Sequence, residues 1–156
     1  MNNPFKFSVA DSLCVFSILA LGACKPTDKT YLSVNVCLEK SENIEAFKEK
    51  MRLIASANQM KFIDSSEQTN SELSTVNGQA AAPQPFVFIG IDDEEGNVVM
   101  GGNMGLTNRQ VALGFREGRN PKADHAFANH VVSMLKNHWR VEPIASDEGA
   151  FPMKSC

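Results

Sequence analysis

Apolar and polar residues alternate along residues 31–38. This period of two predicts a strand with one apolar face. The apolar positions then adopt helical spacing over residues 42–58, which predicts an amphipathic helix. A short apolar run at residues 60–63 predicts a second strand.

The segment that follows is polar and shows no period. It is rich in Ser, Thr, Asn and Gln, contains a run of alanines, and ends in Pro83 and Pro85. A connection of this length is uncommon inside a compact domain. We therefore expect a long polar loop at residues 64–85, which serves either as a surface connection or as a lid or partner-binding segment.

The rest of the chain returns to periodic patterns. Apolar runs and alternation predict three more strands, at residues 86–91, 98–100 and 111–116. Asn120 and Pro121 form a helix start signal, and the apolar stripe behind them predicts a second helix. Residues 139–144 predict a last short strand.

The resulting element order is β-α-β, loop, β-β-β-α-β. This order predicts the α+β class, as a two-layer sandwich with a mostly antiparallel sheet of about five or six short strands and two helices on one face. The nearest simple template is the ferredoxin-like topology. We find no internal repeat and expect one domain over residues 31–156.

The N-terminal residues have the layout of an export signal. A positive start at Lys6 precedes an apolar core, which ends in Leu21-Gly22-Ala23-Cys24. That run resembles the lipobox of bacterial lipoproteins, in which the signal is cut before the cysteine and lipid is attached to its sulfur. The resemblance covers the signal and Cys24 alone; it implies a signal peptide at residues 1–23 and lipidation of Cys24. A buried N-terminal helix is the alternative.

The resemblance also implies a location. Cys24 and a short polar tether would form residues 24–30, and the tether reaches about 20 Å when fully extended. More than one acyl chain on Cys24 would hold the protein stably at a bilayer. In the lipoprotein class an aspartate directly after the cysteine often retains the protein in the inner membrane. Lys25 stands there, so the resemblance implies the outer membrane, facing the periplasm.

Cysteine usage agrees with such a compartment. Cys14 would leave with the signal and Cys24 would carry lipid, so Cys37 and Cys156 remain as a disulfide pair. Cys37 points away from the apolar face of its strand, where a returning tail can reach it. The bridge would close a loop of about 120 residues and stabilise the fold by roughly 4 to 5 kcal/mol. Two unpaired thiols are the alternative.

The formal net charge of −3 argues against one class of partner. Nucleic-acid binding rests on clustered Lys and Arg, and this mildly acidic chain has no such cluster. We expect no nucleic-acid partner and no cofactor.

Three segments contain residue types that bind ligands, but each lacks the required spacing. Residues 101–105 are glycine-rich without the lysine or spacing of a phosphate-binding loop, so we expect a bend or bulge. Residues 92–95 form an acidic turn that does not continue as an EF-hand. Met100 and Met104 have the soft sulfur that copper prefers, but core packing is the simpler interpretation.

The three histidines do not form a metal or catalytic set. His125, His130 and His138 are five and eight residues apart, whereas a metal-binding pair on a helix stands four apart. Asp124 adjoins His125, but neighbours on a helix point about 100° apart and cannot align as in a triad. His125, His130 and the acidic turn remain the candidates for an enzyme.

We therefore hypothesise a non-enzymatic, lipid-anchored protein that faces the periplasm and binds another protein. The contact would use the long loop, an edge of the sheet or the glycine-rich bend. One specific form is an immunity or inhibitor protein against an envelope-acting toxin, whose basic face the mild acidity would complement. The alternatives are a structural accessory of an envelope assembly and a small envelope enzyme.

Overall fold

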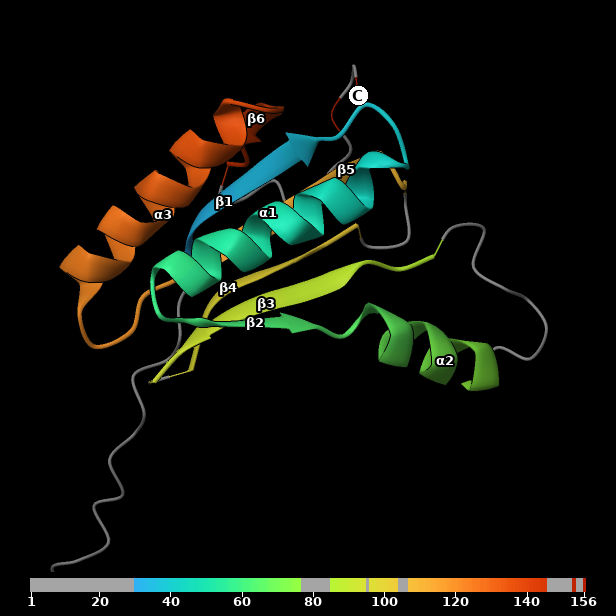
Figure 1. Ribbon diagram of the computed structural model, residues 1–156, viewed down its shortest axis with the longest axis horizontal. Coiled ribbons are helices and arrows are strands. Elements are labelled where there is room, and N and C mark those ends of the chain that lie inside the picture. The colour runs from blue at the N-terminus through green and yellow to red at the C-terminus, as the bar shows by residue number, and fades with distance from the viewer. Residues whose placement is uncertain (1–29, 77–84, 95, 104–106, 146–152, 154–155) are drawn as a thin grey trace, which may run out of the picture.

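The computed structural model describes residues 30–76, 85–94, 96–103, 107–145, 153 and 156. Figure 1 shows one sheet, with α1 and α3 lying against it and α2 continuing from the end of β2. In chain order, the elements are β1 (Thr30–Cys37), α1 (Asn43–Ala57), β2 (Lys61–Asp64), α2 (Ser66–Val76), β3 (Phe88–Asp93), β4 (Gly96–Gly102), β5 (Gln110–Arg116), α3 (Pro121–Lys136) and β6 (Arg140–Pro143).

All six described strands belong to one open sheet in the order β2-β3-β4-β5-β1-β6. Every neighbouring pair is antiparallel. The predicted class, a two-layer α+β sandwich built on a mostly antiparallel sheet, is confirmed.

The strand order departs from the ferredoxin-like template in one respect, because β3 and β4 lie between β5 and β2. β5, α3 and β6 do form a split β-α-β unit, with only β1 between two parallel strands. In contrast, α1 carries the chain from β1 to β2 across three strands. The reason is that β2, β3, β4 and β5 are consecutive in sequence and pair in that order as a meander, which pushes β2 to the far edge.

The core lies between the sheet and the two long helices. Alternate positions of the strands and one stripe of each helix supply it, and each fully buried large side chain contributes about 1.5 to 3 kcal/mol. Phe47 of α1 meets the edge of Trp139, with ring centroids 5.8 Å apart, which ties α1 to the chain that follows α3. The largest fully buried side chains are Phe47, Phe115, Leu38, Met51, Ile89, Ile91, Leu113 and Leu135.

Helix α2 lies where the polar pattern predicts a loop. The expectation of an uninterrupted loop over residues 64–85 is therefore wrong in its first half, and residues 77–84 lie outside the described residues. α2 has no apolar stripe to mark it in the sequence. Its start is held by a polar contact, in which the Ser66 N–H donates to Asp64 Oδ1 at 3.0 Å.

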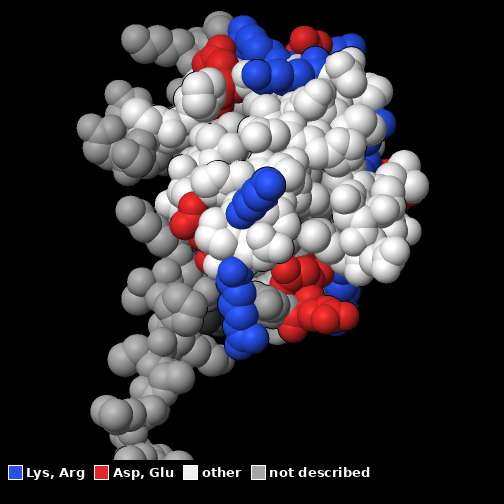
Figure 2. Space-filling model, turned by 90° about the vertical axis from the view of Figure 1, so that its left-hand side faces the viewer, with Lys and Arg blue, Asp and Glu red and all other residues white. Residues whose placement is uncertain are grey.

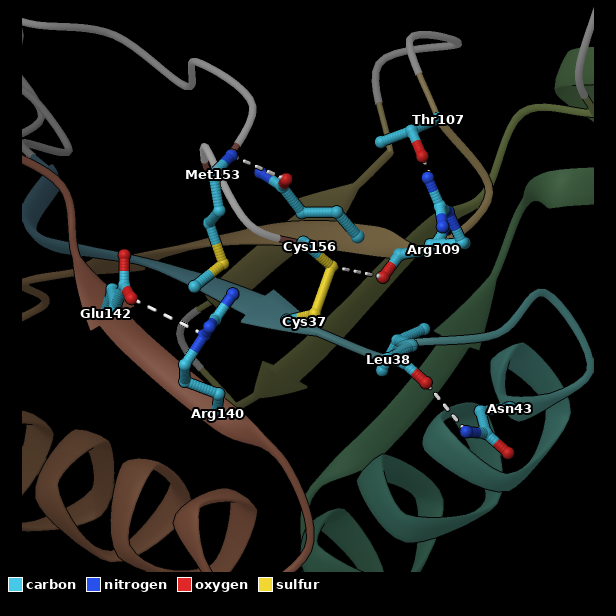
Figure 3. Close-up of a disulfide and its surroundings, with 10 residues drawn as sticks. Cys37, Leu38, Asn43, Thr107, Arg109, Arg140, Glu142, Met153 and Cys156 are labelled. Carbon is cyan, nitrogen blue, oxygen red and sulfur yellow. Dashed lines mark hydrogen bonds and ion pairs between the residues drawn. A yellow bond between two sulfur atoms is a disulfide. The ribbon is translucent and has the colours of Figure 1, made fainter.

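Cys37 and Cys156 form the predicted disulfide, with their Cα atoms 5.4 Å apart. Figure 3 shows this bond between the end of β1 and the returning tail, with Met153 and Arg109 close by. The Met153 N–H donates to Gln110 Oε1 at 2.8 Å, and Cys156 Sγ lies 3.1 Å from the Arg109 carbonyl oxygen. These contacts fasten the C-terminal residues to the beginning of β5.

Asp64 joins three elements. Its Oδ2 lies 3.1 Å from Nζ of Lys48, a buried α1 side chain that also pairs with Glu45 at 3.2 Å. Partial burial acts to raise the pKa of Asp64, but hydrogen bonds from Ser66 and the bond and charge of Lys48 outweigh it, so the pKa lies below its usual value. The carboxylate therefore stabilises the junction of β2, α1 and α2 in its ionised form.

Removing the disulfide is expected to destabilise the domain strongly. The double variant Cys37→Ser with Cys156→Ser should lose about 3 to 5 kcal/mol of unfolding free energy, because the unfolded chain regains the freedom of a long loop. Urea denaturation followed by circular dichroism measures this. Reductant should lower the urea midpoint of the unmodified protein by a similar amount and leave the midpoint of the double variant unchanged. An unaltered urea midpoint in the double variant contradicts the prediction.

Asp64→Asn should lower the unfolding free energy by about 1 to 2 kcal/mol at pH 7, because charge-assisted hydrogen bonds are lost. A carboxylate with a depressed folded pKa contributes stability above its unfolded pKa of about 4, and this contribution disappears as the pH falls through the folded pKa. The difference in unfolding free energy between the unmodified protein and the Asp64→Asn variant should therefore narrow toward pH 2.5. Urea titrations at both pH values test it, and a difference of constant size argues against the role of Asp64.

Candidate binding groove

The two faces of the sheet carry different side chains. Large apolar residues fill the face toward α1 and α3, and we call the opposite side the outer face. Small residues meet at its centre, where Gly102 pairs with Ala112, and Gly114 lies between Met100 and Ser33. These small residues leave a hollow on the outer face, and Met100 of β4 lies beside it.

The hollow is a groove of about 370 Å³. Its floor is formed by β4 and β5, and it extends from Thr69 of α2 to the chain that follows β6. Ser33 and Thr69 supply hydroxyl groups, and no described residue in the lining carries a charge. Its walls are apolar side chains, namely Phe86, Phe88, Met100 and Ile144. A site of this size and character favours an apolar group.

The glycines of the floor have different roles. A Cβ atom at Gly102 would lie 2.4 Å from the Val87 carbonyl oxygen, so this position requires glycine for the close approach of the residue that precedes β3. At Gly114 a Cβ would meet Thr30 Cγ2 at 3.4 Å and the Met100 carbonyl oxygen at 3.8 Å, which are ordinary contacts. A side chain placed at Gly114 would therefore be in van der Waals contact with Thr30 and with the backbone of β4.

Two side-chain amides hold the segment that forms one wall. The Phe86 N–H donates to Asn70 Oδ1 and Asn70 Nδ2 donates to the Phe86 carbonyl oxygen, both at 2.8 Å. On the other side, the Val87 N–H donates to Asn103 Oδ1 at 3.0 Å and Asn103 Nδ2 donates to the Pro85 carbonyl oxygen at 2.8 Å. Each amide imitates a strand partner, which extends the pairing beyond the beginning of β3.

The glycine-rich run at residues 101–105 is not the expected bend. β4 continues through Gly102, and Asn103 is 4% exposed. The bend prediction is wrong over Gly101 and Gly102 because close strand packing, rather than flexibility, requires glycine there. Met104 and Gly105 lie outside the described residues.

The acidic turn closes a hairpin. Asp92 and Asp93 end β3, and Asp93 Oδ1 accepts the Gly96 N–H at 3.0 Å. Gly96 has φ +134°, a conformation that glycine adopts without strain. Within the described part of the chain, no three His, Cys, Asp or Glu residues come together to hold a metal ion.

The histidines are distributed along and beyond α3 and do not converge. His130 is exposed on α3, and His138 lies beside Trp139 with ring centroids 5.5 Å apart. His125 stacks on Tyr31 at 4.1 Å, and its Nε2 lies 2.6 Å from Glu117 Oε1.

Tyr31 docks the beginning of α3 on β1. Its hydroxyl donates to the Asp124 carbonyl oxygen at 3.0 Å. Burial, and then the negative charges of Asp124 and Glu117, raise the pKa of Tyr31 to about 12. The phenol therefore stays protonated and keeps donating at any physiological pH, which is a structural role.

The sheet edges offer little to a partner strand. β2 and β6 are each four residues long. Lys61 in β2 and Pro143 in β6 are residue types that discourage pairing with another chain. The edges are therefore poor contact surfaces for a partner strand.

Charge does not concentrate on the side of the molecule at the left of Figure 1. Figure 2 shows basic and acidic side chains of this side interspersed among uncharged ones, with no broad patch of a single sign. The groove, in contrast, has a defined volume and lining.

Cys24 lies outside the described residues, and none of the described helices is long and apolar enough to cross a membrane. Comparison with protein-family models, with curated proteins and with solved structures finds no match to this chain. The sequence did not predict the groove, because its residues belong to separate strands whose small side chains acquire meaning only through their pairing.

Proposed function

We propose that this chain is a lipid-anchored binding protein that faces the periplasm, and that its groove receives an apolar group of another protein. The observation that carries the proposal is the groove itself. It has the volume of a ligand site, an apolar lining free of charge among the described residues, and a floor of small side chains.

The anchoring part of the proposal rests on the sequence. Leu21-Gly22-Ala23-Cys24 resembles a lipobox, and Lys25 favours the outer membrane. The Cys37–Cys156 disulfide supports an oxidising compartment, because reducing systems keep most cytosolic thiols unpaired. A tether of about 20 Å would hold the groove close to the bilayer.

An immunity or inhibitor protein is the specific form that we favour. Such a protein occupies a surface of its toxin, and an apolar group seated in the groove would anchor that contact. The net charge of −3 would complement a basic toxin face. An accessory of an envelope assembly would use the same groove.

The proposed anchor requires acylation of Cys24, which mass spectrometry can measure. Full-length protein made in a bacterial host should begin at Cys24, carry acyl chains on that residue and sediment with membranes. Cys24→Ser should abolish the acylation and leave the signal uncut, because the modified sulfur is missing. Unacylated Cys24 in an uncut product would remove the anchor from the proposal.

Ala112→Phe should fill the floor of the groove and reduce capture of the partner from envelope extracts at least tenfold, which corresponds to about 1.4 kcal/mol. Ala46→Phe is the matched control, because Ala46 is exposed on α1 and the change is the same. Quantitative mass spectrometry of the captured proteins gives the ratio, and thermal melting verifies that both variants fold. If the Ala112→Phe variant captures as much of the partner as the unmodified chain does, the contact lies elsewhere.

A further inference from the structure

The tether enters the domain beside the groove. Thr30 is the first described residue, and its Cγ2 atom lies 3.4 Å from the position of a Cβ on Gly114, a floor residue. Thr30 is six residues beyond Cys24, a separation of about 20 Å at full extension. Acyl chains attached to Cys24 would therefore lie within reach of the groove.

From this placement we propose that one acyl chain on Cys24 occupies the groove of its own molecule when no bilayer is present. The inference rests on the acylation of Cys24 proposed above. It adds an occupant for the groove and a way in which access of a partner to the groove is regulated.

The lining matches an acyl chain in its chemistry. A hydrocarbon has no group that needs a hydrogen bond, and the described lining offers only the hydroxyls of Ser33 and Thr69. The floor of Gly102, Ala112 and Gly114 suits a narrow, unbranched chain. Met100 at the wall has a flexible thioether that adapts to such a guest.

The tether favours the molecule's own chain over a free one. Linking a ligand to its site by a short flexible segment gives an effective concentration on the order of millimolar. An acyl chain in water also loses apolar exposure when it enters an apolar site. The high effective concentration and the loss of apolar exposure both favour the acyl chain in the groove, as long as no membrane competes for that chain.

Occupancy by the chain's own lipid would couple partner binding to anchoring. A seated acyl chain excludes the apolar group of a partner from the same floor. Insertion of the acyl chain into a bilayer empties the groove, so only the anchored protein is competent to bind. The groove is then free for a partner only after the protein has reached its membrane.

Cysteine labelling tests the inference. Ala112→Cys places a thiol on the groove floor, and Ala46→Cys places a matched thiol on the exposed side of α1. Each variant is prepared as the acylated lipoprotein and as the unacylated mature chain with Cys24→Ser, secreted behind a general export signal. A maleimide reagent is added in detergent-free buffer, with and without vesicles of phosphatidylethanolamine and phosphatidylglycerol.

We expect acylation to slow labelling at Ala112→Cys at least tenfold and the vesicles to restore the rate. Labelling at Ala46→Cys should be the same in every preparation. Gly114→Cys is the second floor variant if Ala112→Cys does not fold, since its Cβ meets only ordinary contacts.

Three outcomes overturn the inference. Equal labelling of the acylated and unacylated floor variants, with acylation verified by mass, would reject self-occupancy and leave the proposed function intact. Slowing at both Ala112→Cys and Ala46→Cys would show self-association of the lipids. Absence of acyl chains on Cys24 would reject this inference together with the proposed anchor.

Discussion

Chain direction determines which side of the sheet the long helices cover. β1 is parallel to β2, and β5 is parallel to β6, because an even number of antiparallel pairings separates the members of each pair. The crossovers through α1 and α3 leave from oppositely directed strands and step in opposite directions across the sheet. Two such crossovers of the same hand cover the same face, and parallel strand crossovers are almost always right-handed. The outer face is thus left without either long helix.

If the outer face carried large apolar side chains throughout, it would expose a large apolar surface to solvent. Instead, Gly102, Ala112, Gly114 and Ser33 leave a hollow between the apolar side chains of Phe86, Phe88, Met100 and Ile144. Polar attachments hold two sides of this hollow in place. Asn70 and Asn103 fix one wall, and on the opposite side the Ile144 N–H donates to the Ser33 carbonyl oxygen at 2.9 Å. The groove is therefore held by bonds outside the hydrophobic core.

Elements with an apolar period were predictable, and those without one were not. β1, β5 and α3 follow from alternation, helical spacing and the start signal, and Asn120 Oδ1 does accept the Ala123 N–H at 3.3 Å. α2 escaped prediction because its stability comes from contacts with Asp64 and the segment before β3, which lie outside its own sequence. Glycines 101 and 102 were misinterpreted for the same reason, since the strands that require them are distant in the sequence.

The sequence alone determined the α+β class and the long helices, because periodicity is a local property of the chain. The pairing of Cys37 with Cys156 was a prediction with unpaired thiols as its alternative, and the tertiary structure decided it. Only the tertiary structure decided the strand order, the helix within the polar segment and the existence of a groove. Each of these depends on which strands become neighbours. A small residue is unremarkable in one strand, and it forms part of a binding site only when strands from elsewhere in the chain place other small residues beside it.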